Sequence, residues 1–133
     1  MRKGIAAWWA AALAAAGLAM GLGAGAVRAE TTEWVNPGVG DWFEPANWSA
    51  GVPASLTDAL VNNGGTAQVR RAGAQALRLI VGESQWRPPS FLEVEAGGRV
   101  SSGGGYLGYY VGAQGTATVT GTGSRWTVSY THL

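Results

Sequence analysis

The chain has 133 residues with no cysteine, a single histidine (His132) and a single lysine (Lys3). This composition excludes disulfides and thiolate metal sites, and it leaves no basis for catalysis centred on cysteine, histidine or lysine. Charged residues make up only 13% of the chain against a usual share of about 25%, and no basic face is left for nucleic acid. We therefore expect a protein with no catalytic, cofactor or metal site and no nucleic-acid partner.

Residues 1–29 have the features of an export signal. Arg2 and Lys3 provide a positive start, 4–27 carry no charge, and Val27-Arg28-Ala29 fits a small-residue cleavage site before Glu30. The uncharged stretch is also long enough to span a bilayer, so a retained anchor is the alternative. In either case we expect an N-terminal signal helix, contact with the membrane only through this segment during export, and the rest of the chain outside the cytoplasm.

From Glu30 onward the sequence predicts an all-β protein. Short runs with period-two alternation of apolar and polar residues are separated by glycine-rich turns at 63–65, 97–98 and 103–105. No stretch has convincing helical spacing. The expected strands are 59–62, 66–70, 77–81, 91–95, 107–111, 116–120 and 126–130.

A weak internal repeat bears on how these strands are arranged. Ile80-Val81-Gly82 returns as Tyr110-Val111-Gly112, an offset of 30, and Val94 followed by Gly97 returns as Val119 followed by Gly121. The difference in spacing places five extra residues in a loop over 84–90. Self-similar strands with glycine corners suggest a stacked β-solenoid, but a small β-sandwich also has strands at this spacing, and the pattern alone leaves the two folds about equally supported. Four valines at equivalent places are expected to face one core: Val81, Val94, Val111 and Val119.

Three tryptophans mark the opening segment of the exported part. Trp34, Trp42 and Trp48 are separated by even numbers of residues, so in extended chain they would share a face. Turn-forming residues such as Pro37 and Pro45 favour a compact knot that closes one end of an apolar coil stack. The alternative is that the three rings form an exposed carbohydrate-binding platform.

Two segments resemble a known family. The first is Trp34-Val-Asn-Pro-Gly-Val-Gly-Asp-Trp42-Phe-Glu-Pro-Ala-Asn47-Trp48-Ser-Ala-Gly51-Val-Pro53, which is similar to the opening of bacterial autotransporter-type passenger proteins. The second, 110–127 with its Gly121-x-Gly123-Ser124-x-Trp126 pattern, is similar to the repeat shared by type V secretion passengers and PEP-CTERM-associated proteins. The resemblance implies a right-handed parallel β-helix that is exported to the bacterial surface or secreted, with a structural or adhesive role. It carries no catalytic residue.

The resulting organisation is a signal peptide at 1–29, a Trp-rich cap at 30–58, solenoid repeats at 59–127 and a doubtful tail at 128–133. The tail departs from the repeat and resembles translated sequencing-adapter read-through, so we expect the natural repeats to continue beyond Thr127. A solenoid that stops in mid-repeat has an uncapped end, and we expect it to self-associate there.

The candidate ligand is a cell-surface component or a polysaccharide. The rival function is a secreted carbohydrate-binding β-domain with exposed tryptophans, and a weaker alternative is the start of a polysaccharide-processing enzyme whose site lies past residue 133. Glu93 and Glu95 could form a carboxylate pair, but alternation with Leu92 and Val94 places them on a solvated outer strand face. Asp41 and Glu44 fit turn caps better than an acid–base pair.

Overall fold

The computed structural model describes residues 29–129, which form nine strands and one short 3₁₀ turn. The expected signal helix falls outside these residues, and so do residues 130–133 of the doubtful tail. The strands are β1 (Glu30–Glu33), β2 (Val39–Asp41), β3 (Thr57–Val61), β4 (Thr66–Val69), β5 (Ala74–Val81), β6 (Ser90–Val94), β7 (Arg99–Leu107), β8 (Gly115–Val119) and β9 (Arg125–Val128), with the 3₁₀ turn η3 at Pro45–Asn47. Every strand lies at or after Glu30, so a chain that starts there contains the whole described fold.

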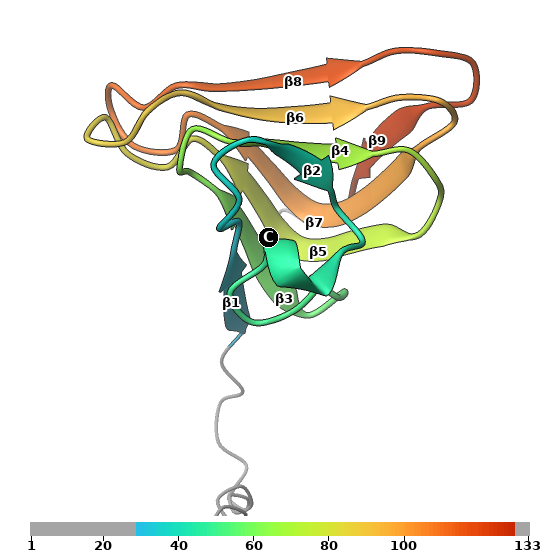
Figure 1. The fold of residues 1–133 in the computed structure, drawn as a ribbon, viewed down its shortest axis with the longest axis horizontal. Coiled ribbons are helices and arrows are strands. Elements are labelled where there is room, and N and C mark those ends of the chain that lie inside the picture. The colour runs from blue at the N-terminus through green and yellow to red at the C-terminus, as the bar shows by residue number, and fades with distance from the viewer. Residues whose placement is uncertain (1–28, 130–133) are drawn as a thin grey trace, which may run out of the picture.

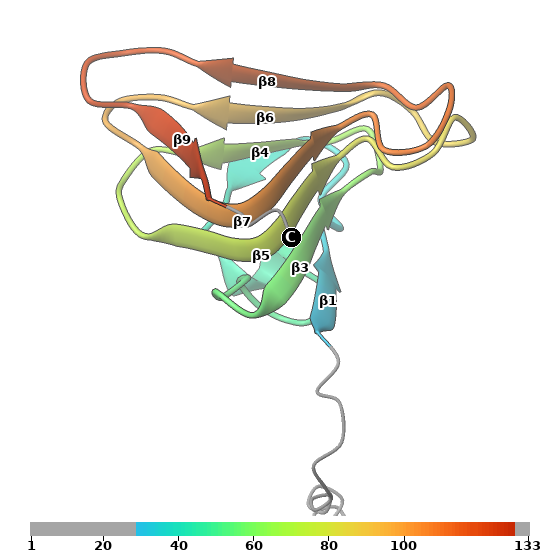
Figure 2. The ribbon, with the colours of Figure 1, turned by 180° about the vertical axis from the view of Figure 1, so that it is seen from behind.

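The strands alternate between two parallel sheets. One sheet has the order β1-β3-β5-β7-β9 and the other the order β2-β4-β6-β8, and every neighbouring pair is parallel. Figure 1 and the reverse view in Figure 2 show the chain winding from one sheet to the other and moving up by one strand at each turn. The fold is a parallel β-solenoid of about four turns, as the resemblance to passenger proteins implied. The β-sandwich alternative is wrong, because a sandwich of hairpin-connected strands would be antiparallel.

The core lies between the two sheets and is built from equivalent residues of successive turns. Ala67 pairs with Leu92, and Val69 pairs with Val94, and all four side chains are buried. On the facing sheet Val61 pairs with Val81, and both are fully buried. Because successive side chains of a strand point to opposite faces, the period-two pattern places one apolar row per strand in this core.

The register differs from the one that the repeat predicted. Val81 pairs with Leu107, an offset of 26 rather than 30, so Gly82 is equivalent to Gly108 and not to Gly112. Both corner glycines have positive φ, of 79° and 73°. The connections 82–89 and 108–114 differ by only one residue, so the expected five-residue insertion in 84–90 is wrong, although those residues do form a loop.

The expected strand 107–111 is also wrong. Strand β7 runs from Arg99 to Leu107, and Gly103, Gly104 and Gly105 lie inside it rather than in a turn. Gly105 pairs with Leu79, and a Cβ at position 105 would lie 2.6 Å from Cζ2 of Trp126. Glycine in the interior of this strand thus makes room for the indole of the next turn.

Of the four valines predicted to face the core, two are buried there. Val81 and Val94 are fully buried, but Val111 lies in a connection after β7 and is 92% exposed. Val119 pairs with Val94 and so points toward the core, yet it is 45% exposed because no described strand covers the last turn. Leu107 and Val128, at the same end of the stack, are also exposed.

The opening segment contributes the first turn of the solenoid rather than a separate knot. Strand β1 pairs with β3 and strand β2 pairs with β4, both in parallel register. At the other end, Val128 belongs to β9, and the Ser129 N–H donates to the Ser102 carbonyl at 3.0 Å, so the register continues into the first residues of the doubtful tail. None of the helical structure described for 29–129 is long and apolar enough to cross a bilayer.

Three valines in different environments should respond differently to a charge. Val94→Asp places a carboxylate in a fully enclosed apolar site and should lower the free energy of unfolding by about 4 kcal/mol or more. Val119→Asp should cost clearly less, because its side chain reaches solvent, and Val111→Asp should change stability by less than about 0.5 kcal/mol. Thermal melts of the three variants test this order, and a Val111→Asp variant as unstable as Val94→Asp would contradict the register.

Candidate functional site

The three tryptophans of the opening segment form one buried cluster. Trp34, at the end of β1, makes an isolated antiparallel bridge with Trp48, which directly follows η3. The Trp48 ring contacts Trp34 and Trp42 edge to face, with centroid separations of 5.1 and 4.9 Å. At most 4% of any of the three side chains is exposed. Burial favours the role in closing the coil stack, and none of these three rings offers an exposed face to a sugar.

The rings meet because the chain folds back, not because the segment is extended. Asn36 Nδ2 donates to Asn47 Oδ1 at 3.1 Å, and Asn47 Nδ2 donates to the Asp41 carbonyl at 3.0 Å. Asp41 Oδ1 accepts from the Phe43 N–H at 2.9 Å, and Glu44 Oε2 accepts from the Ala46 N–H at 3.2 Å. Both acids therefore cap turns, as predicted, and these bonds fix the loop that delivers Trp42 and Trp48 to the core.

The outer face of the β2-β4-β6-β8 sheet carries a ladder of polar side chains. Asp41, Gln68 and Glu93 are register neighbours, and Gln68 Nε2 donates to Glu93 Oε1 at 2.8 Å. One residue pair further along, Arg70 lies 3.3 Å from a Glu95 carboxylate oxygen. The prediction that Glu93 and Glu95 lie on an outer strand face is confirmed, and each acid has a partner on the neighbouring strand.

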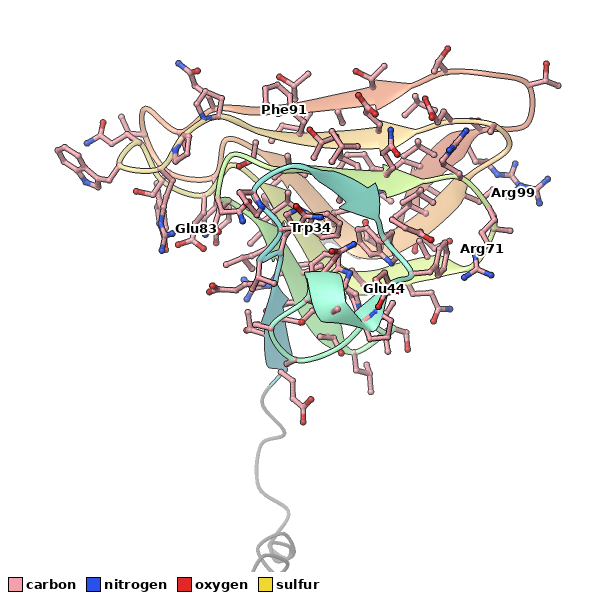
Figure 3. The ribbon with its side chains drawn as sticks, viewed as in Figure 1. Trp34, Glu44, Arg71, Glu83, Phe91 and Arg99 are labelled. Carbon is pink, nitrogen blue, oxygen red and sulfur yellow. The ribbon has the colours of Figure 1, made fainter. Side chains whose placement is uncertain are left out.

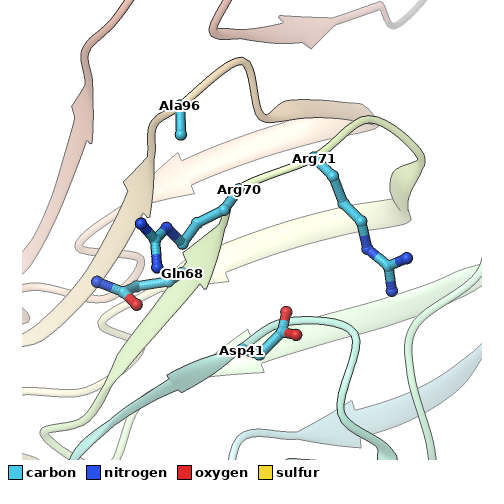
Figure 4. A pocket seen from close by; sticks show the side chains of 5 residues that line it. All are labelled: Asp41, Gln68, Arg70, Arg71 and Ala96. Atoms are coloured by element: carbon cyan, nitrogen blue, oxygen red, sulfur yellow. The ribbon is translucent and has the colours of Figure 1, made fainter.

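A shallow depression of about 380 Å³ lies beside this ladder and is lined by Asp41, Gln68, Arg70, Arg71 and Ala96 (Figure 4). Arg70 and Gln68 extend on one side of it and Arg71 on the other, where the Arg71 guanidinium lies 4.2 Å from the centre of the Phe43 ring. Arg70 forms an ion pair with Glu95, the guanidinium of Arg71 stacks on the Phe43 ring, and Asp41 Oδ1 accepts from the Phe43 N–H, so charges of both signs line this depression. No cluster of three or more His, Asp or Glu side chains suitable for a metal occurs within 29–129.

An ion pair lies on the outer face of the other sheet. Arg78 Nε donates to Asp58 Oδ1 at 3.0 Å, and its second bond to the same carboxylate makes the pair bidentate. The Asp58 side chain is buried, whereas nearly half of the Arg78 side chain is exposed. This hydrogen bond raises the pKa of Arg78 above its ordinary value, with smaller contributions from Tyr109 and Tyr106. Arg78 therefore stays charged and is neutralised locally by Asp58.

A set of exposed side chains lies at one end of the solenoid, and we call it the aromatic corner. It is carried by the end of β7 and by the two connections 82–89 and 108–114, which extend together at one end of the solenoid in Figures 1 and 2. Tyr109 contacts Tyr106 and Tyr110 edge to face, with centroid separations of 5.0 and 4.8 Å. Trp86 is 85% exposed and Tyr110 59% exposed. The members of the aromatic corner are Trp86, Tyr106, Tyr109, Tyr110 and Val111.

Sequence reasoning missed the aromatic corner. It placed Tyr109 and Val111 in a strand, and a strand would have turned one side of this segment inward. The signal that could have found it is the pairing of Gly82 with Gly108 as equivalent corner residues, since both are followed by a loop of similar length. That alignment makes residues 109–111 the counterpart of the loop 83–85 rather than of strand β5.

No family model matches the chain, and no curated protein and no solved structure matches it either. The fold itself defines the class of protein, an all-β parallel β-solenoid.

The cluster predicts unequal roles for two buried indole N–H groups. Trp48 Nε1 donates to the Trp42 carbonyl at 2.7 Å, whereas Trp34 Nε1 is buried without a hydrogen-bond partner. Trp48→Phe removes a hydrogen bond and leaves a carbonyl unsatisfied, so it should cost about 1–3 kcal/mol more than Trp34→Phe, which loses ring area but no hydrogen bond. Chemical denaturation of both variants measures the difference, and an equal or larger loss for Trp34→Phe would contradict it.

Proposed function

We propose that this chain is the opening part of an exported bacterial passenger protein of the autotransporter-like type, with a structural or adhesive role and no catalysis. The observation that carries the proposal is a parallel solenoid whose first turn is closed by buried tryptophans and whose last described turn presents core-facing side chains to solvent. The resemblance of 34–53 and 110–127 to segments of such passengers supports the same function.

The arrangement of surfaces also supports a scaffold over an enzyme. The carboxylates of the outer polar ladder are paired with strand neighbours, and Asp41 and Glu44 cap turns. Asp58 is held by Arg78. These groups are used to hold the coils in register, and an extended repetitive surface of this kind is suited to display and adhesion.

Export is the first test of the proposal. When the full chain is produced in a Gram-negative host, we expect it to leave the cytoplasm with an N-terminus at Glu30, because 1–29 fit a cleaved signal. A variant with Arg2→Glu and Lys3→Glu reverses the positive start and should remain uncleaved. Cell fractionation and N-terminal mass spectrometry report both outcomes. An uncleaved parent chain in the cytoplasm would contradict the proposal.

The exposed end of the stack supports a second part of the proposal, self-association. Val119 and Val128 are exposed, although their register partners Val94 and Ser102 in the preceding turn are buried. Strands β8 and β9 are the last members of their sheets, so each has a paired strand on one side only. An apolar edge of this kind is a template for a strand of another molecule.

We therefore expect the chain from Glu30 to Leu133 to form oligomers whose size increases with concentration. Val119→Lys with Val128→Lys places two charges on the open edge and should shift the chain toward monomer. Val39→Lys is the control, since Val39 is an exposed valine on the first turn, at the opposite end of the stack. Light scattering over a concentration series distinguishes these cases. A parent chain that stays monomeric at high concentration would refute self-association through this end.

A further inference from the structure

The aromatic corner combines exposed rings on two connections with one ring at the end of β7. Trp86 comes from 82–89, Tyr109 and Tyr110 come from 108–114, and Tyr106 comes from the adjoining end of β7. Exposed apolar groups that cluster in this way mark interaction sites more often than single exposed residues do. We propose that the aromatic corner is a binding site for a neutral polysaccharide. This inference rests on the proposed adhesive function and names its ligand class.

The two connections hold the aromatic corner in a defined shape. The Tyr109 N–H donates to the Gly82 carbonyl at 2.8 Å, and the Tyr110 N–H donates to the Glu83 carbonyl at 3.0 Å. These bonds continue the parallel ladder of β5 and β7 into the loops, so the loops lie side by side. The backbone that carries Tyr109 and Tyr110 is therefore held without a ligand, which lowers the ordering entropy that binding would cost.

Hydrogen bonds within the loop 82–89 also hold the backbone that carries Trp86. The Trp86 N–H donates to Ser84 Oγ at 3.1 Å, and the Arg87 N–H donates to the Ser84 carbonyl at 3.1 Å. Pro88 and Pro89 follow and restrict the backbone where the loop returns to β6. A tryptophan that is 85% exposed on a fixed turn can present its ring to a partner.

The chemistry of the aromatic corner fits a sugar. An aromatic ring packs on the C–H face of a pyranose, and tyrosine adds a hydroxyl that can hydrogen-bond sugar hydroxyls. Three of the four rings are tyrosines, and Tyr106 lies two residues beyond Gly104, which is the register partner of the half-exposed Arg78. Apart from Val111, the exposed apolar members of the corner are aromatic, and the loops around them are polar, with Ser84, Gln85 and Gln114.

The charge at this place favours a neutral ligand. Arg78 is neutralised by the buried carboxylate of Asp58, and Glu83 and Arg87 on the same loop have opposite signs. Figure 3 shows Glu83 on the same end of the solenoid as the two connections. An acidic polysaccharide would find no excess of positive charge here, and a nucleic acid would lack the basic surface that its phosphates require. Trp86 and Tyr110 are 85% and 59% exposed, and rings this exposed suit a chain polymer that extends over the surface more than a small molecule, which would need a more enclosed cavity.

Affinity electrophoresis tests the inference with the chain that starts at Glu30. Native gels contain hydroxyethylcellulose, xylan or dextran as neutral probes and alginate as an acidic probe. We expect retardation by at least one neutral probe and none by alginate. Trp86→Ala with Tyr110→Ala removes the two most exposed rings and should weaken binding about tenfold or more.

Phe91→Ala is the matched control, because Phe91 is an exposed aromatic residue on the outer face of the other sheet and should bind like the parent chain (Figure 3). Trp86→Ala alone, at a side chain that is almost entirely in solvent, guards against a folding defect and should still weaken binding. Unchanged retardation of the double variant, retardation by alginate only, or no retardation by any neutral probe would each overturn the inference. The export test does not involve the aromatic corner, so the two proposals can fail separately.

Discussion

A single parallel strand cannot bury its own apolar side chains. In this chain they are buried because successive turns stack on one another, and the other features of the structure depend on that stacking. Each strand forms hydrogen bonds with the equivalent strand of the next turn, which places Val69 beside Val94 and Val61 beside Val81. The two inward rows then face each other across the core. Because each turn is covered by its neighbours, stability grows with the number of stacked turns, and the two ends of the stack pose separate problems.

Three buried tryptophans close the first turn, and two of them have an indole N–H without a hydrogen-bond partner. The indole N–H groups of Trp34 and Trp42 are buried without a partner, and each such group costs about 1–3 kcal/mol. Burial of one tryptophan ring removes about 150–250 Å² from water, which contributes about 4–6 kcal/mol. The hydrophobic term is larger, so a cluster with two unsatisfied donors still stabilises the end of the stack. These three tryptophans therefore stabilise the fold and, being buried, are not available as a binding surface.

Exposed aromatic side chains are instead concentrated where the chain leaves the two sheets. The corner glycines Gly82 and Gly108 end the ladder of β5 and β7 and begin two connections that project beside each other. The sheets supply a rigid base, while residues in the connections do not have to pack in the core. This division explains why Tyr110 and Trp86 can be exposed although Trp34, Trp42 and Trp48 are almost completely buried.

Local pattern was sufficient for much of the fold. The period-two runs in 59–62, 66–70, 77–81, 91–95, 116–120 and 126–130 overlap β3, β4, β5, β6, β8 and β9. The weak repeat suggested stacked strands but with the wrong alignment, and the parallel arrangement came from the resemblance to passenger proteins. The polar side of β6 was correctly placed on the outer face. These features depend on residues close together in the sequence, whose alternation and turn chemistry act within one strand. The burial of the tryptophan cluster agrees with the expected cap, although its hydrogen bonds were not foreseeable from spacing.

The tertiary structure alone decided the register and, with it, the candidate site. Gly103, Gly104 and Gly105 read locally as a turn, yet they continue β7 because β5 supplies a hydrogen-bonding partner on one side and Trp126 of the next turn fills the space above Gly105. Because β7 continues through these glycines, the offset between equivalent residues is 26 rather than the predicted 30. The segment 109–111, predicted as a core strand, is therefore an exposed loop. The sequence by itself therefore determined which segments are strands and that they stack, because those properties are local. Which residue faces which, and hence which aromatic side chains reach the surface, was decided by contacts between turns that lie 25 or more residues apart in the chain.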